Sequence, residues 1–251
     1  MKKFENIFYS EMQDSEQVLD LYLPDIEDFP VFIYFHGGGI VEGDKTNGKF
    51  FDSLVEKGIA VISANYRMYP RASYPDFLED SAAAVAWAYT HMNEYGNPTG
   101  YYVGGSSAGG YITQMLCFDK SYLAAHGIDA DQVDGYFMDA GQPTTHFNVL
   151  KERGLDSRRV IIDEAAPIFH IVGDRTYAPM FILVSDNDME NRPEQTALLV
   201  STLKHFRCDM DRVDYKIMEN SKHCRYVNAF DENGNSIFAD LIFNFIKKYS
   251  F

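Results

Sequence analysis

A short glycine–serine motif in the middle of the chain could supply nucleophilic chemistry. Gly105-Ser106-Ser107-Ala108-Gly109 has the pattern G-x-S-x-G, between a short apolar run at 100–104 and a helical pattern at about 108–118. Glycines at these places allow a strained strand-to-helix turn that exposes a serine hydroxyl, and the helix N-terminus offers N–H donors to an oxyanion. Ser107 is the preferred nucleophile because Ser106 fits only a G-x-S-x-A frame. The alternative interpretation is a glycine-rich turn that binds phosphate or only packs.

A second glycine-rich segment directly follows the apolar run at 31–35. His36-Gly37-Gly38-Gly39 allows the backbone to approach a bound molecule closely and to present N–H donors to it. The alternative is a flexible loop that exposes a histidine. We expect His36 to orient this loop rather than to act as a base.

Together, these motifs resemble those of the α/β-hydrolase superfamily. The matching residues are His36-Gly37-Gly38-Gly39, Asn65-Tyr66-Arg67 with Pro70, and Gly105-Ser106-Ser107-Ala108-Gly109-Gly110. Within the superfamily they resemble hormone-sensitive-lipase-like esterases and the kynurenine-formamidase-like and feruloyl- or acetylxylan-esterase-like groups. The resemblance covers the chain from about residue 17 to its C-terminus. It implies an α/β-hydrolase fold, with a mostly parallel central sheet flanked by helices and a small lid or none.

The resemblance also implies an oxyanion hole made by the N–H groups of Gly38, Gly39 and Ala108. Two residues depart from the usual pattern. Ile40 follows the glycine run where many relatives have an aromatic residue, and Cys224 follows the histidine proposed below where glycine is frequent. Neither removes a catalytic atom.

The family order Ser, acid, His places the base near the C-terminus. His223 is the one histidine after Ser107 that follows the last expected strand, at 213–218, in a polar loop. His205 falls within a helical pattern. The other three precede the acid candidates and so break the order: His126, His146 and His170.

The acid is expected just after the strand that ends at Ser185. Asp186, Asp188 and Glu190 are the candidates. In the family the acid comes three residues after a glycine, and Ser185 stands where that glycine would be, which selects Asp188 with Asp186 next. The alternative is a solvated acidic loop or a helix cap. A calcium loop is disfavoured because the sixth position lacks glycine.

Four residues are weaker candidates for substrate binding: His36, Phe147, Tyr177 and Tyr226. Phe169 could also line an acyl or alcohol pocket. Ordinary core packing is the competing interpretation for each aromatic residue. Arg67 and Asp80 are expected to tie together the loops beneath the site.

Short β-rich runs alternate with helical patterns, which predicts an α/β protein with a largely parallel sheet. Residues 17–23 resemble an edge strand. Residues 31–35, 59–64, 100–104, 135–140, 179–185 and 213–218 are further strand candidates, and 77–95, 108–118, 194–206 and 237–249 are helical. Residues 142–178 have weak periodicity and are expected to form a small lid or insertion in a single domain spanning 1–251.

The composition excludes several classes of protein. Of 251 residues, 22 are Lys or Arg and 37 are Asp or Glu, so the net charge of −15 disfavours nucleic acids and anionic membranes as partners. Three cysteines without C-x-x-C spacing argue against a disulfide framework and a zinc site. We expect no cofactor, no metal, no secretory signal and a cytoplasmic location. A small ester or amide is the expected partner, and a homodimer is left open.

The leading hypothesis is a serine carboxylesterase with the triad Ser107, Asp188 and His223. It would act through an acyl-enzyme on small or medium uncharged esters, such as short acyl chains or acetylated or aromatic-acylated sugars. The alternative is an arylformamidase of the N-formylkynurenine type, which could use the same triad. A binding protein on a retired hydrolase fold is disfavoured because Ser107 and His223 are both present.

Overall fold

Eight strands form one sheet in the order β1-β2-β4-β3-β5-β6-β7-β8. The computed structural model describes residues 1–173 and 175–250. The two pairs that involve β2 are antiparallel, and the other five pairs are parallel. The predicted α/β class with a mostly parallel sheet is therefore confirmed. The strands are β1 (Lys2–Phe8), β2 (Val18–Leu23), β3 (Asp28–Phe35), β4 (Ala60–Ala64), β5 (Asn97–Ser106), β6 (Gly135–Asp139), β7 (Met180–Asn187) and β8 (Val213–Lys222).

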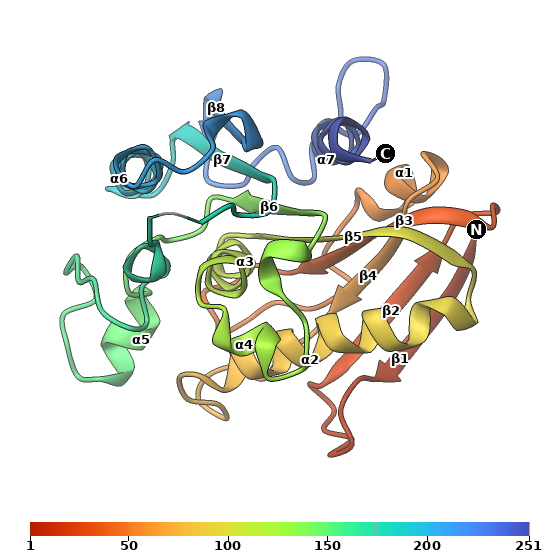
Figure 1. Cartoon of the computed structure of the whole chain (residues 1–251), viewed down its shortest axis with the longest axis horizontal. Helices are drawn as coiled ribbons and strands as arrows, with labels where there is room; N and C mark the ends of the chain where they lie inside the picture. The colour runs from red at the N-terminus through yellow and green to blue at the C-terminus, as the bar shows by residue number, and fades with distance from the viewer. Residues whose placement is uncertain (174, 251) are drawn as a thin grey trace.

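Helices cover both faces of the sheet. Figure 1 shows α1 and α7 on one side of the twisted sheet and α2 and α3 on the other. The α-helices are α1 (Phe51–Glu56), α2 (Asp76–His91), α3 (Ala108–Phe118), α4 (Ser121–Ala124), α5 (Phe147–Glu152), α6 (Arg192–His205) and α7 (Ile237–Tyr249). Single 3₁₀ turns are η1 (Met92–Glu94), η2 (Ala130–Gln132), η3 (Pro167–His170) and η4 (Met210–Arg212).

The continuous apolar runs form central strands because both of their faces are covered. In β3, Val31, Ile33 and Phe35 belong to the core shared with α2, α3 and α6. Phe32 and Tyr34 point to the opposite core, which includes residues of α1 and α7. Every second side chain thus enters each layer, as the period of a strand requires.

The predicted edge position of residues 17–23 is wrong. β2 lies inside the sheet between β1 and β4, and β1 forms the edge. β1 escaped the sequence pattern because most of its side chains are exposed and Lys2, Lys3 and Glu5 interrupt its apolar residues. Exposed, charged residues are typical of an edge strand, where pairing with another chain must be avoided.

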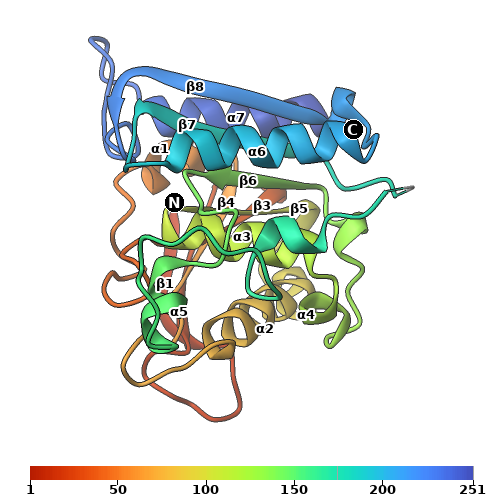
Figure 2. The same ribbon diagram turned by 90° about the vertical axis from the view of Figure 1, so that its left-hand side faces the viewer.

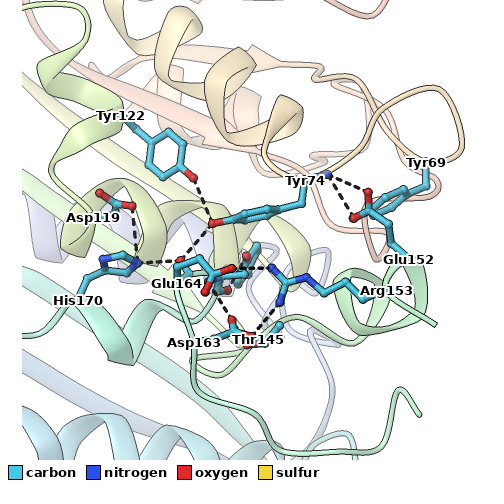
Figure 3. Close-up of polar contacts among 12 residues, drawn as sticks. Tyr69, Tyr74, Asp119, Tyr122, Thr145, Glu152, Arg153, Asp163, Glu164 and His170 are labelled. Atoms are coloured by element: carbon cyan, nitrogen blue, oxygen red, sulfur yellow. Dashed lines mark hydrogen bonds and ion pairs between the residues drawn. The ribbon is translucent and has the colours of Figure 1, made fainter. Parts of the chain in front are cut away.

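Residues 142–173, most of the segment expected to form a lid or insertion, contain α5 and η3. Figure 3 shows how polar side chains anchor this segment to the rest of the molecule. Glu152 accepts a hydrogen bond from the Tyr69 hydroxyl (2.6 Å), in the loop before α2. Arg153 pairs with Asp163 (2.8 Å) and Glu164 (3.1 Å), which closes the base of the intervening loop. A lid function for this segment, and the single domain spanning 1–251, stay predictions.

The loops that follow the strands determine where chemistry can occur. Parallel strands of such a sheet bring their carboxyl ends to one edge, where ligands usually bind. In Figure 2, α5 and the loop after β8 lie on the same side of the molecule, at this edge. In the part of the chain that the structure describes, no helix has the length and apolar character that crossing a membrane requires.

Candidate active site

Ser107 occupies the sharp turn between β5 and α3. Its backbone is in an unusual conformation (φ 56°, ψ −112°), and its N–H donates to the carbonyl oxygen of Asp139 at the end of β6 (2.8 Å). The flanking glycines leave room for this turn. A Cβ atom on Gly109 would lie 1.9 Å from the carbonyl oxygen of Phe35, and one on Gly105 would lie 2.5 Å from the backbone of Gly109. The motif therefore matches a nucleophile elbow in geometry as well as in sequence.

Ser107, His223 and Asp188 form a continuous hydrogen-bonded chain. The Ser107 Oγ lies 2.8 Å from Nε2 of His223, and Nδ1 of His223 lies 2.5 Å from Oδ1 of Asp188. With the proton on Nδ1 donated to the carboxylate, Nε2 is free to accept the proton of the serine hydroxyl. Ser107 lies 116 positions from His223 in the chain, and Asp188 lies 35 positions from it. The structure thus brings together three residues that are distant in the sequence.

The Asp188 carboxylate is stabilised in its charged form. Burial alone would raise its pKa, but hydrogen bonds from His223 and from the N–H groups of Met189 and Ser185 outweigh burial and lower the pKa below its ordinary value. The other acidic candidates lie apart from the imidazole. Asp186 accepts hydrogen bonds from the N–H groups of Asn220 and Ser221 and so holds the end of β8 in place. Glu190 lies in a neighbouring cavity.

The glycine run after β3 faces the nucleophile. Gly38 and Gly39 have positive φ angles (113° and 64°), and a Cβ on Gly38 would lie 1.8 Å from the carbonyl oxygen of Glu42. Only glycine fits such a backbone without strain. Among the described residues, no hydrogen bond engages the N–H groups of Gly38, Gly39 or Ala108. These donors are available to a bound oxyanion.

Asn148, on α5, fixes this loop and was not singled out by the sequence. Its Nδ2 donates to the carbonyl oxygen of Gly39 (2.6 Å), while its own N–H donates to Nδ1 of His146 (3.2 Å). Burial lowers the pKa of His146 to about 3, so the ring stays neutral and can accept this bond. Helix α5 thereby supports the glycine loop through Asn148.

His36 is buried at the base of the same loop. Its ring stacks on Tyr66 with centroids 4.5 Å apart, and its Nδ1 lies 2.7 Å from the carbonyl oxygen of Gly37. Burial lowers its pKa, which keeps the imidazole neutral. Its position agrees with an orienting role, since the ring is held against Tyr66 and the backbone of Gly37.

A cavity of about 640 Å³ opens in front of Ser107. Its walls include Phe147, Met189 and Val227, with Glu42, Asn47 and Asn228 as polar groups. A cavity of this size suits a small or medium ligand. Of the weaker candidates, His36 and Phe147 line it, and Tyr177 and Tyr226 do not.

Tyr177 lies far from this cavity. It precedes β7, at the amino edge of the sheet, where its ring packs edge-on against Phe118 and beneath the Lys120 ammonium. Its hydroxyl forms hydrogen bonds with the backbone N–H and the carbonyl oxygen of Val172. Phe169 is exposed on the surface. Sequence reasoning could not exclude these positions because aromatic residues follow no pattern that separates pocket from core.

Tyr226 has a different role from the expected contact with substrate. Its ring is buried, and its hydroxyl donates to Oδ1 of Asp139 at the end of β6. The hydroxyl of Ser106, the rejected nucleophile, is buried and has no hydrogen-bond partner among the described residues. Asp139 was not predicted, although its place at the carboxyl end of a parallel strand was a usable signal.

The Asp139 carboxyl group is fully buried behind the triad. Burial raises the pKa of this carboxyl group to about 6. Ser106, Tyr226 and His223 lower the pKa but do not outweigh burial. Cys224 lies beside it, and burial raises the pKa of that thiol well above its ordinary value. The thiol therefore stays protonated and is a poor nucleophile. Below the site, Arg67 and Asp80 form the expected pair, with two contacts of 2.8 Å.

The sequence is similar to curated esterases over part of its length. Esterase LipI from Mycobacterium tuberculosis is 38% identical over 96 residues, which cover 37% of this chain and 30% of that protein. Tuliposide A-converting enzyme b1 from Tulipa gesneriana is 31% identical over 136 residues, covering 47% and 36%. The matches thus span about a third of the length of these curated relatives.

Two solved structures share the fold over nearly the whole chain. Esterase B from Lactobacillus rhamnosis superimposes with a TM-score of 0.76 at 17% identity, covering 98% of this chain and 85% of that one. A truncated carbohydrate esterase from gut microbiota has a TM-score of 0.77 at 16% identity, covering 100% and 96%. The predicted resemblance to α/β-hydrolase esterases is confirmed. The model of the BD-FAE family matches residues 19–149, more than half of the sequence, and the chain belongs to that family.

Proposed function

We propose that the protein is a serine hydrolase that cleaves carboxylic esters, with Ser107 as nucleophile, His223 as general base and Asp188 as its partner. The observation that carries this proposal is the hydrogen-bonded chain Ser107–His223–Asp188, which ends in an open cavity. The esterase relatives supply the reaction class. A serine alcohol is a weak nucleophile on its own and requires an adjacent base.

The proposed mechanism gives each of these groups a role. The Ser107 Oγ attacks the ester carbonyl carbon while His223 Nε2 takes its proton. The N–H groups of Gly38, Gly39 and Ala108 receive the negative oxygen, and the C–O bond then breaks as the imidazolium protonates the departing alcohol. Water attacks the acyl-enzyme in a second step with the same base. Asp188 holds the imidazole in the required tautomer and stabilises its positive charge.

The shape of the cavity supports substrates of limited size. About 640 Å³ accommodates a short acyl chain together with a small alcohol or a sugar. Its polar wall of Glu42, Asn47 and Asn228 offers hydrogen bonds to hydroxyl groups, whereas Phe147 and Val227 offer apolar contact. Esters that are uncharged next to the scissile bond fit this wall, since Glu42 would repel an anion there.

Turnover of p-nitrophenyl acetate, butyrate and octanoate, beside N-formylkynurenine, tests the proposal. We expect ester activity that falls with chain length and a loss of at least about 10³-fold in Ser107→Ala. Ser106→Ala is the matched control, and it should retain covalent labelling by a fluorophosphonate probe. Dominant formamide turnover would favour the arylformamidase alternative. Labelling that persists in folded Ser107→Ala would refute the assignment of the nucleophile.

A further inference from the structure

A second cavity, of about 360 Å³, lies beside the catalytic one. Phe147 and Met189 line both cavities, so the two cavities adjoin at these side chains. The second cavity is formed by the tip of the loop between α5 and η3 and by the start of α6. Its composition differs from that of the first. Arg158, Arg159 and Arg192 line it, against the single carboxylate of Glu190.

These arginines are unusual in a chain with a net charge of −15. Arg158 is compensated by Asp156 (2.6 Å), outside the cavity. Among the described residues, Arg159 and Arg192 have no carboxylate within 4 Å. After Glu190 is counted, the cavity therefore retains about one positive charge. A site with this balance attracts an anionic group more strongly than a neutral group of the same shape.

The floor of the cavity is built from buried polar groups. Arg192 is only 4% exposed, and its guanidinium donates to the carbonyl oxygen of Ala140 and to Oε1 of Gln142 (3.4 Å). A buried charge without an opposite charge is costly unless something compensates it. Gln195 is 9% exposed, and its Oε1 accepts from Thr144 (2.8 Å). In the described part of the chain, no hydrogen bond engages the Gln195 Nε2, which leaves a donor at the floor.

The loop that contains Arg158 and Arg159 is held at its base. Arg153 pairs with Asp163 (2.8 Å), and the Thr145 hydroxyl donates to the same carboxylate (2.7 Å). Figure 3 shows these contacts between the two ends of the loop. The two arginines therefore extend from a closed loop rather than from a free chain.

We infer that this second cavity is a subsite for a carboxylate group at the far end of the ester substrate. This inference rests on the proposed ester hydrolysis. The guanidinium groups and the Gln195 amide are donors suited to carboxylate oxygens. Glu42 in the first cavity and the arginines in the second orient such a substrate, with the neutral ester at Ser107 and the anionic end beyond Phe147. The expected substrates are thus half-esters or esters of hydroxy or phenolic acids.

Two matched pairs of esters test this subsite. On the leaving-group side, 4-acetoxybenzoate is compared with its neutral methyl ester. On the acyl side, the mono-p-nitrophenyl ester of adipic acid is compared with p-nitrophenyl hexanoate. For each pair, the ratio of kcat/KM between the anionic and the neutral ester is measured in the wild type and in Arg158→Gln/Arg159→Gln. Each exposed charge contributes up to about fivefold to binding, and the double variant removes two such charges. We therefore expect the ratio for one of the two pairs to fall about tenfold in the double variant.

Arg207→Gln is the matched control, since Arg207 is exposed just beyond the other end of α6. Its ratio should equal that of the wild type. In the wild type the ratio should also fall as NaCl rises from 0.02 to 0.5 M, because exposed charges are screened. Equal ratios in the wild type and the double variant, for both pairs, would overturn the subsite.

Binding separates failure of the subsite from failure of the proposed function. If no ester is hydrolysed, the esterase proposal fails, and saturation-transfer NMR with monomethyl adipate and dimethyl adipate decides the subsite alone. Preferential binding of the monoanion that disappears in Arg159→Glu supports it. Equal binding of the two adipates to the wild type refutes it.

Discussion

The hydroxyl of Tyr226 donates a hydrogen bond to the buried carboxyl group of Asp139. Tyr226 lies three residues after His223, and the carbonyl oxygen of Asp139 accepts the N–H of Ser107 (2.8 Å). One residue at the end of β6 is therefore bonded both to the turn of the nucleophile and to the loop of the base. We therefore expect Asp139 and Tyr226 to act as positioning residues for the proposed triad.

Removal of the Tyr226 hydroxyl should loosen the His223 loop. In Tyr226→Phe we expect the free energy of unfolding to fall by about 1–2 kcal/mol at pH 7, because a hydrogen bond to a buried carboxylate is lost. We also expect kcat for p-nitrophenyl butyrate to fall about tenfold, with a smaller change in KM, because the base is less well placed. Urea unfolding and steady-state kinetics measure the two effects. Tyr215→Phe, on the exposed part of β8, is the control and should change neither. An unchanged kcat in Tyr226→Phe would contradict the positioning role.

Asp139 should make stability depend on pH in a specific direction. Burial raises its pKa from 3.8 in the unfolded chain to about 6 in the fold. Between these values the folded protein binds more protons at this site, so the stability contributed by Asp139 is lost as pH rises. The difference in unfolding free energy between the wild type and Asp139→Asn should fall by up to about 3 kcal/mol between pH 4 and pH 7. Urea unfolding across this range checks it, and other titrating groups cancel in the difference. A difference that is constant with pH would exclude the raised pKa.

The two acidic residues after β7 should respond differently to the same substitution. Asp188→Asn should lower kcat by about 10⁴, because the amide no longer selects the required tautomer of His223. Asp186→Asn weakens hydrogen bonds to the N–H groups of Asn220 and Ser221 and should slightly lower the midpoint of urea unfolding while turnover persists. Steady-state kinetics and urea unfolding of both variants provide the comparison. Comparable losses of kcat would show that Asp188 has no special role.

The glycine loop should tolerate no side chain at Gly38. In Gly38→Ala the new Cβ would meet the carbonyl oxygen of Glu42 at 1.8 Å, so the loop must move and its N–H donors with it. Loss of such a donor lowers kcat by about 10²–10³. Gly127→Ala is the matched control, since Gly127 also has a positive φ (73°) but has nothing within 4 Å of a new Cβ. It should cost about 1 kcal/mol in unfolding free energy and leave kcat unaltered. If Gly38→Ala keeps wild-type kcat, the donors of this loop do not stabilise the transition state.

Much of the fold and of the candidate site could be predicted because the signals are local. The runs at 31–35 and 180–184 are apolar on both faces, which is sufficient to identify central strands. The glycines around Ser107 and in the run from Gly37 to Gly39 specify backbone conformations that other residues cannot adopt. Chain order then limited the base and the acid to a few positions, of which the structure brings His223 and Asp188 to Ser107.

The tertiary structure alone decided which distant side chains meet. Tyr226 and Tyr177 look equivalent in the sequence, yet one is bonded to Asp139 behind the triad and the other lies at the opposite edge of the sheet. The pairing of β1 at the sheet edge was equally unreadable. The sequence by itself determined the strands, the tight turns and the order of the reactive groups, because these depend on neighbours in the chain. The buried Asp139 and the arginine-lined cavity depend on strand order and helix packing, which bring together residues that share no local pattern.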